Sequence, residues 1–492
     1  MINKNISQNL FPIGGSLKDA MVQLNKGIGG VLCCIDENEK MLGVLTDGDI
    51  RRALLAGRKI TDLVENNMNC SFTAGKDNAH HEENIKKLTT TIRHLPILDK
   101  AGHLVDLISW ADMWRLSVAE PSLSGNEMKY VMDCISTTWI SSQGKYIDKF
   151  QDIFVRFLRG GEALCTSSGT TALHLALTAL GIGSNDEVIV PNITFGATAN
   201  VVIHAGATPI FVDICPKTWT IDPGSIESAI SSNTKAIIPV HLYGHPCDMD
   251  PIMDIAKRYN LKVIEDCAES LGAEYKGKKV GLIGDVGCFS FFANKVITTG
   301  EGGMCVSRNN SIVERMKLLR DHGMSKEIRY WHLEPGFNYR MTNVQAAIGL
   351  AQMENIDNFL KQRNTVVACY NKNLSKIDGI RTPPNSTWAK NIHWLYSIEV
   401  DESVLGVERD QLSLQLMDRG IDCRPVFPPL HLQPAYGSGK HNTFPFSENF
   451  AKRGLSLPTS NGLSVEDVKR VCDAIEAIVN NNKSIDAIYI RQ

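Results

Sequence analysis

The sequence predicts an α/β protein with more than one domain, and two observations lead to this prediction. First, short apolar runs that end in polar residues alternate with helical patterns. Leu261–Asp266 has the composition of a buried strand, and Ala172–Leu180 has that of an amphipathic helix, an alternation typical of α/β sheets. Second, residues 35–49 align without a gap on residues 98–112, so the N-terminal part of the chain contains an intramolecular pair.

The N-terminal repeat has the same order of elements in each copy. Each copy reads as a strand, a turn and a second strand, followed by a hydroxyl residue and, three positions later, an aspartate. These residues are Thr46 with Asp49 in the first copy and Ser109 with Asp112 in the second. The copies differ, because Trp110 stands where the first copy has Asp47, so equivalent sites are not expected.

The run Gly43-Val-Leu-Thr-Asp-Gly-Asp49, placed before a helix, resembles the signature of CBS-domain pairs. The resemblance implies an α+β CBS pair over residues 1–117, whose hydroxyl and aspartate residues would contact the ribose of a regulatory nucleotide. Arg51 and Arg52 follow directly and could meet its phosphates. The alternative is that Asp49 and Asp112 only cap helices, and that the pair serves assembly without binding a ligand.

Lys295 lies where a short apolar strand, Cys288–Phe292, meets a loop of glycine and hydroxyl residues. An ordinary solvated lysine has no need of Gly300, Gly302 and Gly303 beside it. At an unperturbed pKa near ~10.4, only about one lysine in a few thousand is neutral at pH 7. A lysine that attacks carbonyl groups therefore needs burial or nearby positive charge. The segment predicts such a lysine; a surface lysine beside a tight turn is the alternative.

Two further segments predict the partners of this lysine. The strand Leu261–Asp266 ends in acids, and ligands of open α/β sheets bind at the carboxyl ends of strands. A carboxylate there can keep the pyridine nitrogen of pyridoxal phosphate (PLP) protonated, although it could also cap the next helix. Upstream, Ser167-Ser-Gly-Thr170 precedes the helix over Ala172–Leu180, and a helix start of this kind can bind phosphate.

In this order the segments resemble the PLP-dependent sugar aminotransferases of the DegT/DnrJ/EryC1/StrS type, from about Pro121 to about Asn480. Further stretches carry the resemblance: residues 138–146 (TWISSQGKY), 186–195 (DEVIVPNITF), 197–200 (ATAN), 239–244 (PVHLYG), 336–341 (GFNYRM) and 429–434 (PLHLQP). The resemblance implies fold-type I, with a large mixed-sheet α/β/α domain over residues 118–365. A small α+β domain over 366–480 and a tail over 481–492 would follow.

The resemblance also implies a role for each matching residue. Lys295 would form the covalent link to PLP and then move protons, and Asp266 would pair with the pyridine nitrogen. Glu269 would lie near the ring hydroxyl, and Phe195 would stack on the ring. The phosphate contacts would be Ser168, Gly169, Thr170 and Ser290. Asn338 would reach the phosphate of the neighbouring subunit, which implies a homodimer or a higher homo-oligomer. Taken alone, Phe195 reads as a core residue, Asn338 as a turn residue and Glu269 as a helix cap.

The expected reaction is amination of a nucleotide-linked keto sugar, a 4-keto-6-deoxy hexose, with glutamate as the usual donor in this family. The product would serve surface polysaccharide or glycan biosynthesis. Family members with histidine at the lysine position are dehydratases, and this chain has Lys295 there. PLP-dependent dehydration is one alternative. The other is a nucleotide-sensing regulator with a PLP-domain scaffold, against which the intact Lys295 and Asp266 argue.

Length and composition agree with a cytoplasmic enzyme. The 492 residues leave room for three domain-sized units. A net charge of −3, with both signs mixed, gives no basic face for nucleic acid. The 13 cysteines form no CxxC motif, as expected in a reducing compartment, and no apolar run approaches the ~18 residues of a membrane span. His241, His322 and His431 lack metal-ligand spacing, so no metal is predicted.

Overall fold

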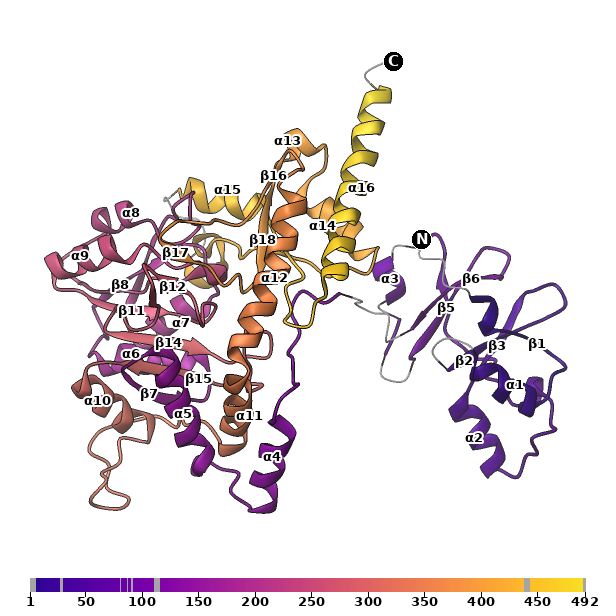
Figure 1. Cartoon of the computed structure of the whole chain (residues 1–492), viewed down its shortest axis with the longest axis horizontal. Coiled ribbons are helices and arrows are strands. Elements are labelled where there is room, and N and C mark those ends of the chain that lie inside the picture. Colours follow the sequence, from indigo (N-terminus) through magenta and orange to yellow (C-terminus); the bar gives the residue numbers. More distant parts are fainter. Residues whose placement is uncertain are drawn as a thin grey trace. The chain divides into compact units, whose positions relative to one another are not determined.

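The computed structural model describes residues 6–26, 30–79, 81–85, 87–89, 92–109, 116–437 and 443–489, so Trp110 and Asp112 lie outside the described residues. The chain divides into two compact units (Figure 1). The smaller unit comprises Met1–Ser117 with Leu414–Asp422, and the larger comprises Val118–Ser413 with Cys423–Gln492.

The sequence repeat is also a structural repeat in the smaller unit. Each copy is a three-stranded sheet in which two antiparallel strands are joined by a short parallel one. The sheets are β1 (Leu10–Pro12), β2 (Val31–Ile35) and β3 (Met41–Thr46), and β4 (Gly75–Lys76), β5 (His94–Leu98) and β6 (Leu104–Ser109). The helices are α1 (Leu17–Leu24), α2 (Asp47–Leu55) and α3 (His81–Ile85).

The two copies share irregularities as well as strands. Each antiparallel ladder is interrupted at the equivalent step, Cys34/Ile35 in one and Ile97/Leu98 in the other. Glu39 and Gly102, at equivalent turn positions, both have positive φ, 60° and 93°. The two copies therefore share the backbone geometry of the strand pair in detail, although few of their side chains are the same.

A seven-stranded mixed sheet forms the centre of the larger unit. Its order is β7 (Glu162–Thr166), β15 (Gly303–Ser307), β14 (Val286–Ser290), β11 (Lys262–Asp266), β10 (Thr234–Ile237), β8 (Glu187–Pro191) and β9 (Thr208–Val212). β15 is antiparallel to both of its neighbours, and the other pairings are parallel.

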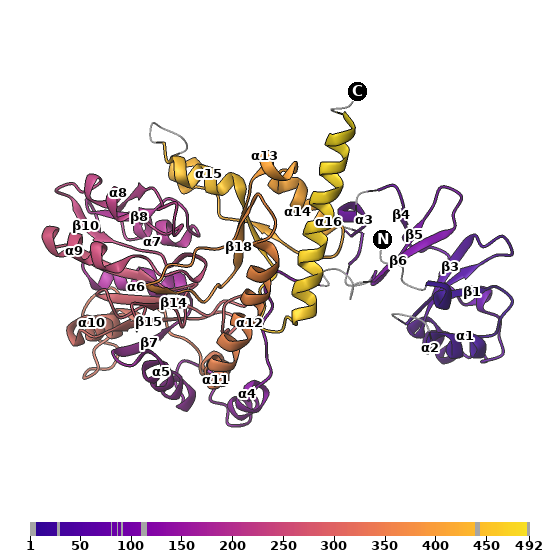
Figure 2. The ribbon, with the colours of Figure 1, turned by 45° about the horizontal axis from the view of Figure 1, so that its top comes forward.

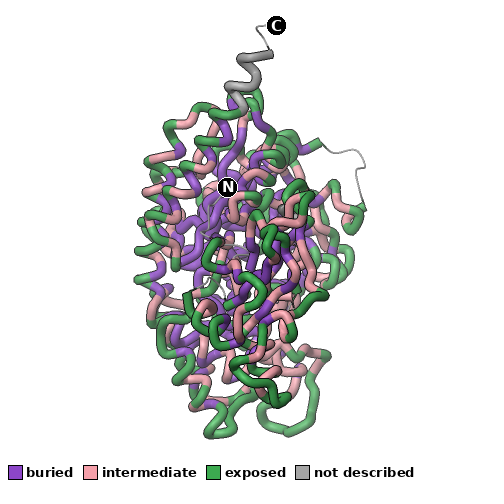
Figure 3. The backbone as a smooth tube through the Cα atoms, turned by 90° about the vertical axis from the view of Figure 1, so that its right-hand side faces the viewer, coloured by how far each residue is buried: buried purple, intermediate pink, exposed green. Residues whose placement is uncertain are grey.

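Both faces of this sheet are covered by helices, as its alternating side chains require. Along β8, Val188 and Val190 join one apolar cluster and Ile189 joins another. The first cluster includes residues of α6 (Gly169–Ala179), α7 (Ala197–His204) and α10 (Asn310–Arg320). The second includes residues of α4 (Glu127–Ser136), α5 (Lys145–Leu158), α8 (Pro223–Ser228), α9 (Met249–Tyr259) and α11 (Asn343–Glu354). Figure 2 shows helices around the sheet, and in Figure 3 buried residues are concentrated inside the molecule while exposed ones lie mainly at its outside.

Two smaller sheets complete the larger unit. One consists of β16 (Ile380–Arg381), β18 (Tyr396–Val400), β20 (Gly454–Leu457) and β19 (Arg424–Pro425), and the other of β13 (Lys278–Lys279), β12 (Glu274–Tyr275) and β17 (Ala389–Lys390). The remaining helices are α12 (Ile356–Leu374), α13 (Glu402–Leu405), α14 (Arg409–Met417), α15 (Pro445–Arg453) and α16 (Val465–Tyr489). Among the described residues, no helix is both long and apolar enough to cross a membrane.

Several element boundaries differ from those expected. The strand expected at Cys288–Phe292 ends at Ser290, and the helix expected at Ala172–Leu180 begins at Gly169 because Ser168 caps it. The tail expected over 481–492 is helical as far as Tyr489. Once a helix has been nucleated by packed residues, each further turn costs little, so α16 runs through this polar segment.

Candidate active site

The predicted site residues follow strands whose carboxyl ends meet at one edge of the large sheet. β7, β8, β11 and β14 run in the same direction, and the antiparallel β15 begins at that edge with Gly303. The residues placed there are Ser168, Gly169 and Thr170 after β7, Phe195 after β8, Asp266 and Glu269 at the end of β11, and Ser290 and Lys295 at the end of β14. Parallel topology therefore brings together segments distant in sequence.

Two glycines let residues 168–170, the segment predicted to bind phosphate, pack tightly against the segment from Ser290 to Gly303 that contains Lys295. A Cβ at Gly303 would lie 2.3 Å from the Ser168 carbonyl oxygen, and one at Gly169 would lie 2.7 Å from the Ser290 Cβ. Ser168 caps α6 by accepting a hydrogen bond from the Thr171 N–H at 3.1 Å. The first N–H groups of α6 and its dipole can bind an anion here, which fits the phosphate of PLP.

Asp266 is a buried carboxylate with fixed orientation. Thr198 Oγ1 donates to its Oδ2 at 2.8 Å, and the Ala268 N–H donates to its Oδ1 at 3.1 Å. Burial raises the pKa of Asp266, and the hydrogen bonds from Ala268 and Thr198 oppose that rise. The arrangement suits a carboxylate that pairs with a pyridine nitrogen. Thr198 lies in the ATAN stretch, but sequence analysis assigned it no role.

Lys295 faces the buried carboxylate of Glu269. Its Nζ lies 3.8 Å from Glu269 Oε1, and the Lys295 side chain is 13% exposed. The Tyr243 N–H donates to Glu269 Oε2 at 2.8 Å. Burial raises the pKa of Glu269 to about 7 and lowers that of Lys295, against the attraction of Glu269 and Asp266. Lys295 therefore has the burial that an amine nucleophile needs.

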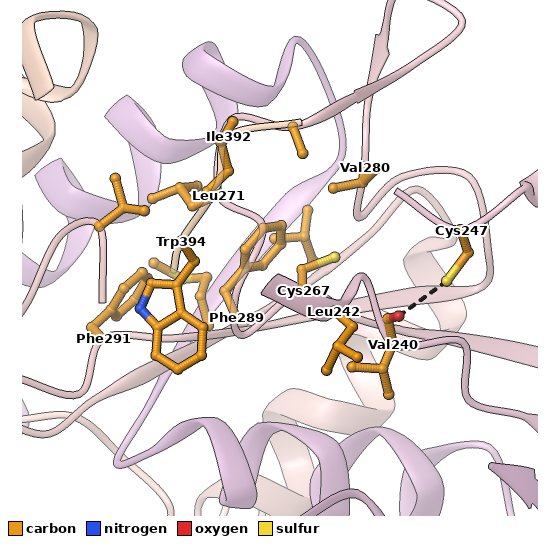
Figure 4. Close-up of a cluster of buried hydrophobic side chains, with 14 of the residues drawn as sticks. Val240, Leu242, Cys247, Cys267, Leu271, Val280, Phe289, Phe291, Ile392 and Trp394 are labelled. Atoms are coloured by element: carbon orange, nitrogen blue, oxygen red, sulfur yellow. Dashed lines mark hydrogen bonds between the residues drawn. The ribbon is translucent and has the colours of Figure 1, made fainter. Parts of the chain in front are cut away.

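Trp394 is a site residue that sequence analysis missed. Its ring centroid lies 3.6 Å from Lys295 Nζ, within the range of a cation–π contact, and its indole N–H donates to the Asn294 carbonyl oxygen at 2.8 Å. Figure 4 shows this indole beside Phe289 and Phe291. Trp394 reads as an ordinary core residue, and only its tertiary position reveals the contact.

Phe195 and Asn338 are both exposed. Phe195 is 62% exposed, with its ring centroid 6.0 Å from that of Phe427. It is not the core residue that its position alone suggested, and an exposed aromatic can stack on a bound ring. Asn338 Oδ1 accepts a 3.4 Å hydrogen bond from Arg340. The carbonyl oxygen of the next residue, Tyr339, accepts a hydrogen bond from the Ser167 N–H at 2.9 Å, so Asn338 lies near the phosphate segment of its own chain.

Residues 430–436, of the same larger unit, hold the segment that carries Phe195. The Leu430 N–H donates to the Asn192 carbonyl oxygen, and the His431 N–H donates to Asn192 Oδ1 at 3.0 Å. On the other side of Phe195, the Tyr436 hydroxyl donates to Asn200 Oδ1 at 2.7 Å. The PLHLQP stretch therefore bonds directly to the PNITF stretch.

In the smaller unit, Thr46 and Asp49 of the first repeat copy cap the start of α2. Asp49 Oδ2 accepts from the Thr46 N–H and hydroxyl, and Thr46 Oγ1 accepts from the Asp49 N–H. Arg52 and Arg51 pair with Asp49 and Asp47 at 2.6 and 2.8 Å. In the second copy Ser109 is a buried residue at the end of β6. The nucleotide role of these residues stays a prediction.

His241, Glu265 and Cys267 form a buried cluster of potential metal ligands, but hydrogen bonds occupy it. The Cys247 N–H donates to His241 Nδ1 at 3.0 Å, so the proton lies on Nε2, which faces Glu265 Oε2 at 3.2 Å. Glu265 also accepts from the N–H groups of Gly281, Ile283 and Gly284. These bonds give the cluster a structural role between strands.

Comparison with known proteins identifies two regions. Residues 121–476 match the DegT/DnrJ/EryC1/StrS aminotransferase family, and residues 11–56 match the CBS domain. The GDP-perosamine synthase of Caulobacter vibrioides is 47% identical over 370 residues, 75% of this chain and 100% of that protein. The GDP-perosamine synthase of Escherichia coli O157:H7 is 45% identical over 363 residues, 74% of this chain and 98% of that protein.

A solved structure shows the same fold in the larger unit. The PLP form of the putative sugar aminotransferase Spr1654 from Streptococcus pneumoniae is 28% identical, with a TM-score of 0.69. It covers 74% of this chain, and the match includes 98% of that chain. The predicted fold class and both predicted family resemblances are confirmed.

Proposed function

This chain belongs to the DegT/DnrJ/EryC1/StrS aminotransferase family, and from that premise we propose that it aminates a nucleotide-linked keto sugar. It is a PLP-dependent aminotransferase with an N-terminal CBS domain. The observation that carries the proposal is the largely buried Lys295 with Glu269 and Trp394 against its amine, at the same sheet edge as the fixed carboxylate of Asp266.

The residues at the sheet edge fit PLP. The α6 start with Ser168, Gly169 and Thr170, together with Ser290, would hold its phosphate, and Asp266 its pyridine nitrogen. Phe195 would cover the ring, and Glu269 would lie near the ring hydroxyl. When bound, PLP supplies an electron sink for amino transfer.

Lys295 would bind the cofactor covalently and, once released, carry protons between donor and acceptor carbon atoms. Burial favours its neutral form for this work. Asp266 would keep the pyridine nitrogen protonated throughout. Trp394 and Glu269 would keep the amine within its pocket.

We propose GDP as the nucleotide, because two relatives that this chain matches over nearly their whole length are named GDP-perosamine synthases. The 4-keto-6-deoxy hexose, the glutamate donor and a role in surface polysaccharide biosynthesis follow from the family resemblance. We also propose that the enzyme is a cytoplasmic homo-oligomer of at least two subunits. PLP-dependent dehydration is the second candidate, and Lys295 in place of histidine disfavours it.

The test supplies the purified protein with glutamate and with GDP-, UDP- or dTDP-linked 4-keto-6-deoxy hexoses. We expect 2-oxoglutarate formation and an amino-sugar mass, with the GDP sugar the fastest. Lys295→Ala is the matched control. Its turnover should fall by several orders of magnitude with unchanged thermal unfolding. A product that has lost water without gaining nitrogen would support the dehydratase, and control turnover above a tenth of wild type would refute the role of Lys295.

A further inference from the structure

Arg363, on α12, is a buried cation that the reaction does not use. It is 3% exposed, and among the described residues no carboxylate pairs with it. Burial lowers the pKa of Arg363 to about 10. A buried, unpaired charge is costly and persists only where hydrogen bonds compensate it, so its partners indicate what it does.

Four oxygen atoms surround the Arg363 guanidinium. Its Nη1, which carries two hydrogens, lies 2.9, 2.8 and 2.8 Å from the carbonyl oxygens of His393, Trp394 and Thr459, so two of these acceptors share one N–H. Its Nη2 donates to Asn461 Oδ1 at 2.8 Å. The second nitrogen of the fork makes the bond to Asn461, whereas a lysine ammonium is a single point charge that could replace Nη1 or Nη2 but not both.

Two of these partners hold the residues on either side of Lys295. The Trp394 indole N–H donates to the Asn294 carbonyl oxygen at 2.8 Å, and Asn461 Nδ2 donates to the Val296 carbonyl oxygen at 2.9 Å. Arg363 thus reaches the backbone before and after the lysine through two side chains. One of them, Trp394, also presents its ring face to Nζ.

We propose that Arg363 is a positioning residue for Lys295. It acts through Trp394 and Asn461, which fix the peptide units flanking the lysine and so the direction in which Nζ points. The assignment rests on the proposed role of Lys295. The orientation of Lys295 then depends on residues away from the sheet edge. They lie on α12 and between residues 393 and 461.

The test compares Arg363→Lys with Arg409→Lys. Arg409 is the control because its Nη1 also donates to two backbone carbonyl oxygens, those of Ala451 and Gly454, and no described contact joins it to Lys295. Unlike Arg363, it is part-buried and pairs with a carboxylate, that of Asp410. The first readout is amide hydrogen exchange of residues 292–300 in the cofactor-free protein. The second is the rate at which borohydride traps PLP on Lys295, located by peptide mass.

We expect exchange at residues 292–300 to rise about tenfold or more, and trapping to slow by about tenfold, in Arg363→Lys only. Both variants should lose thermal stability. If Arg363→Lys does not fold, Asn461→Ser cuts one arm and should raise exchange beside Val296 alone. Equal protection in the two arginine variants, or unchanged exchange in Asn461→Ser, would overturn the proposal. If PLP is trapped on another lysine in wild type, the proposed role of Lys295 is wrong. The exchange comparison would then still test whether Arg363 orders residues 292–300.

Discussion

Asp266 and Lys295 illustrate how burial changes the chemistry of single residues. Both occupy positions where their charged forms are poorly solvated, and each charge is partly supported by its neighbours. For Asp266 the support includes the Thr198 hydroxyl, 2.8 Å from Oδ2. Substitutions that keep shape and remove charge therefore separate electrostatic from structural roles.

Asp266→Asn should keep PLP bound and slow the half-reaction with glutamate. The amide can still accept the Thr198 hydrogen bond, but it cannot hold a pyridinium proton as a carboxylate does. The loss should be about a hundredfold or more, as for other preorganised electrostatic contacts. Single-turnover absorbance measures the rate and cofactor analysis measures retention. If Asp266→Asn has the kinetics of wild type, the role of Asp266 is only to cap the segment that follows it.

Glu269→Gln should shift the pH dependence of Lys295 towards lower pH. Burial lowers the pKa of Lys295, and in wild type the Glu269 carboxylate opposes that fall by favouring the ammonium form. The neutral amide removes this attraction, so the amine should become reactive at lower pH. The initial rate of PLP incorporation into cofactor-free protein, measured from about pH 5 to about pH 10, checks the shift. An unmoved midpoint would mean that the pair at 3.8 Å is not coupled.

The position of Lys295 at the sheet edge could be predicted from sequence, whereas the residues that contact it could not; its catalytic role stays a prediction. Lys295 and Asp266 each follow a short apolar strand within a few residues, so local pattern suffices. Trp394 and Tyr243 act through a ring face and a backbone N–H brought in by tertiary packing. The neighbourhood of Trp394 differs in nothing from ordinary core, and the 239–244 stretch that contains Tyr243 gives no sign that its backbone N–H contacts Glu269.

At the scale of elements, the repeat copies were the most predictable part of the chain. β2 and β3 correspond to β5 and β6 residue for residue, and even the interrupted ladder step recurs. Alternation and turn residues determine such local antiparallel pairs. The register with β1 and β4 could not be predicted, because those strands are too short to show a period.

Asp49→Ala separates capping from nucleotide binding when compared with Asp19→Ala. Ser16 and Asp19 form the same capping box at α1 as Thr46 and Asp49 form at α2. Each variant should destabilise the smaller unit to a similar extent, because each removes the same half of a capping box. Only Asp49→Ala should weaken nucleotide binding, about ten- to a hundredfold.

Calorimetry on the full-length chain, with adenine, guanine, cytidine and uridine nucleotides and their sugar conjugates, measures this affinity. Equal affinities in the two variants would leave Asp49 as a cap. No binding across the panel would leave the repeat as an assembly module.

At the scale of the whole molecule, the sheet edge in one chain carries nearly every predicted site residue. The seven-stranded order explains this, since parallel strands present their carboxyl ends together. The order itself could not be read from the sequence, because periodicity does not reveal which strands are neighbours. Asn338 remains the residue predicted to act in a partner's site.

Mixing Lys295→Ala and Asn338→Asp chains should restore activity if sites are shared between subunits. Each variant alone should be inactive, the second because the introduced carboxylate would repel the cofactor phosphate. The local structure should survive, because Arg340 can still donate to this carboxylate. Hybrid dimers with one intact site would give up to about a quarter of wild-type activity in an equal mixture. Absence of complementation after subunit exchange, or full activity of Asn338→Asp alone, would refute the shared site.

The position of β15 has a consequence for biosynthesis. Among the described strands, β7 lies at the edge of its sheet and pairs with β15 alone, and residues 167–302 separate the two in sequence. During translation β7 must therefore wait until Gly303–Ser307 has left the ribosome. The phosphate segment after β7 cannot take its final place earlier, so a nascent chain acquires its cofactor site late. The N-terminal strand pairs, by contrast, can close as soon as their own residues emerge.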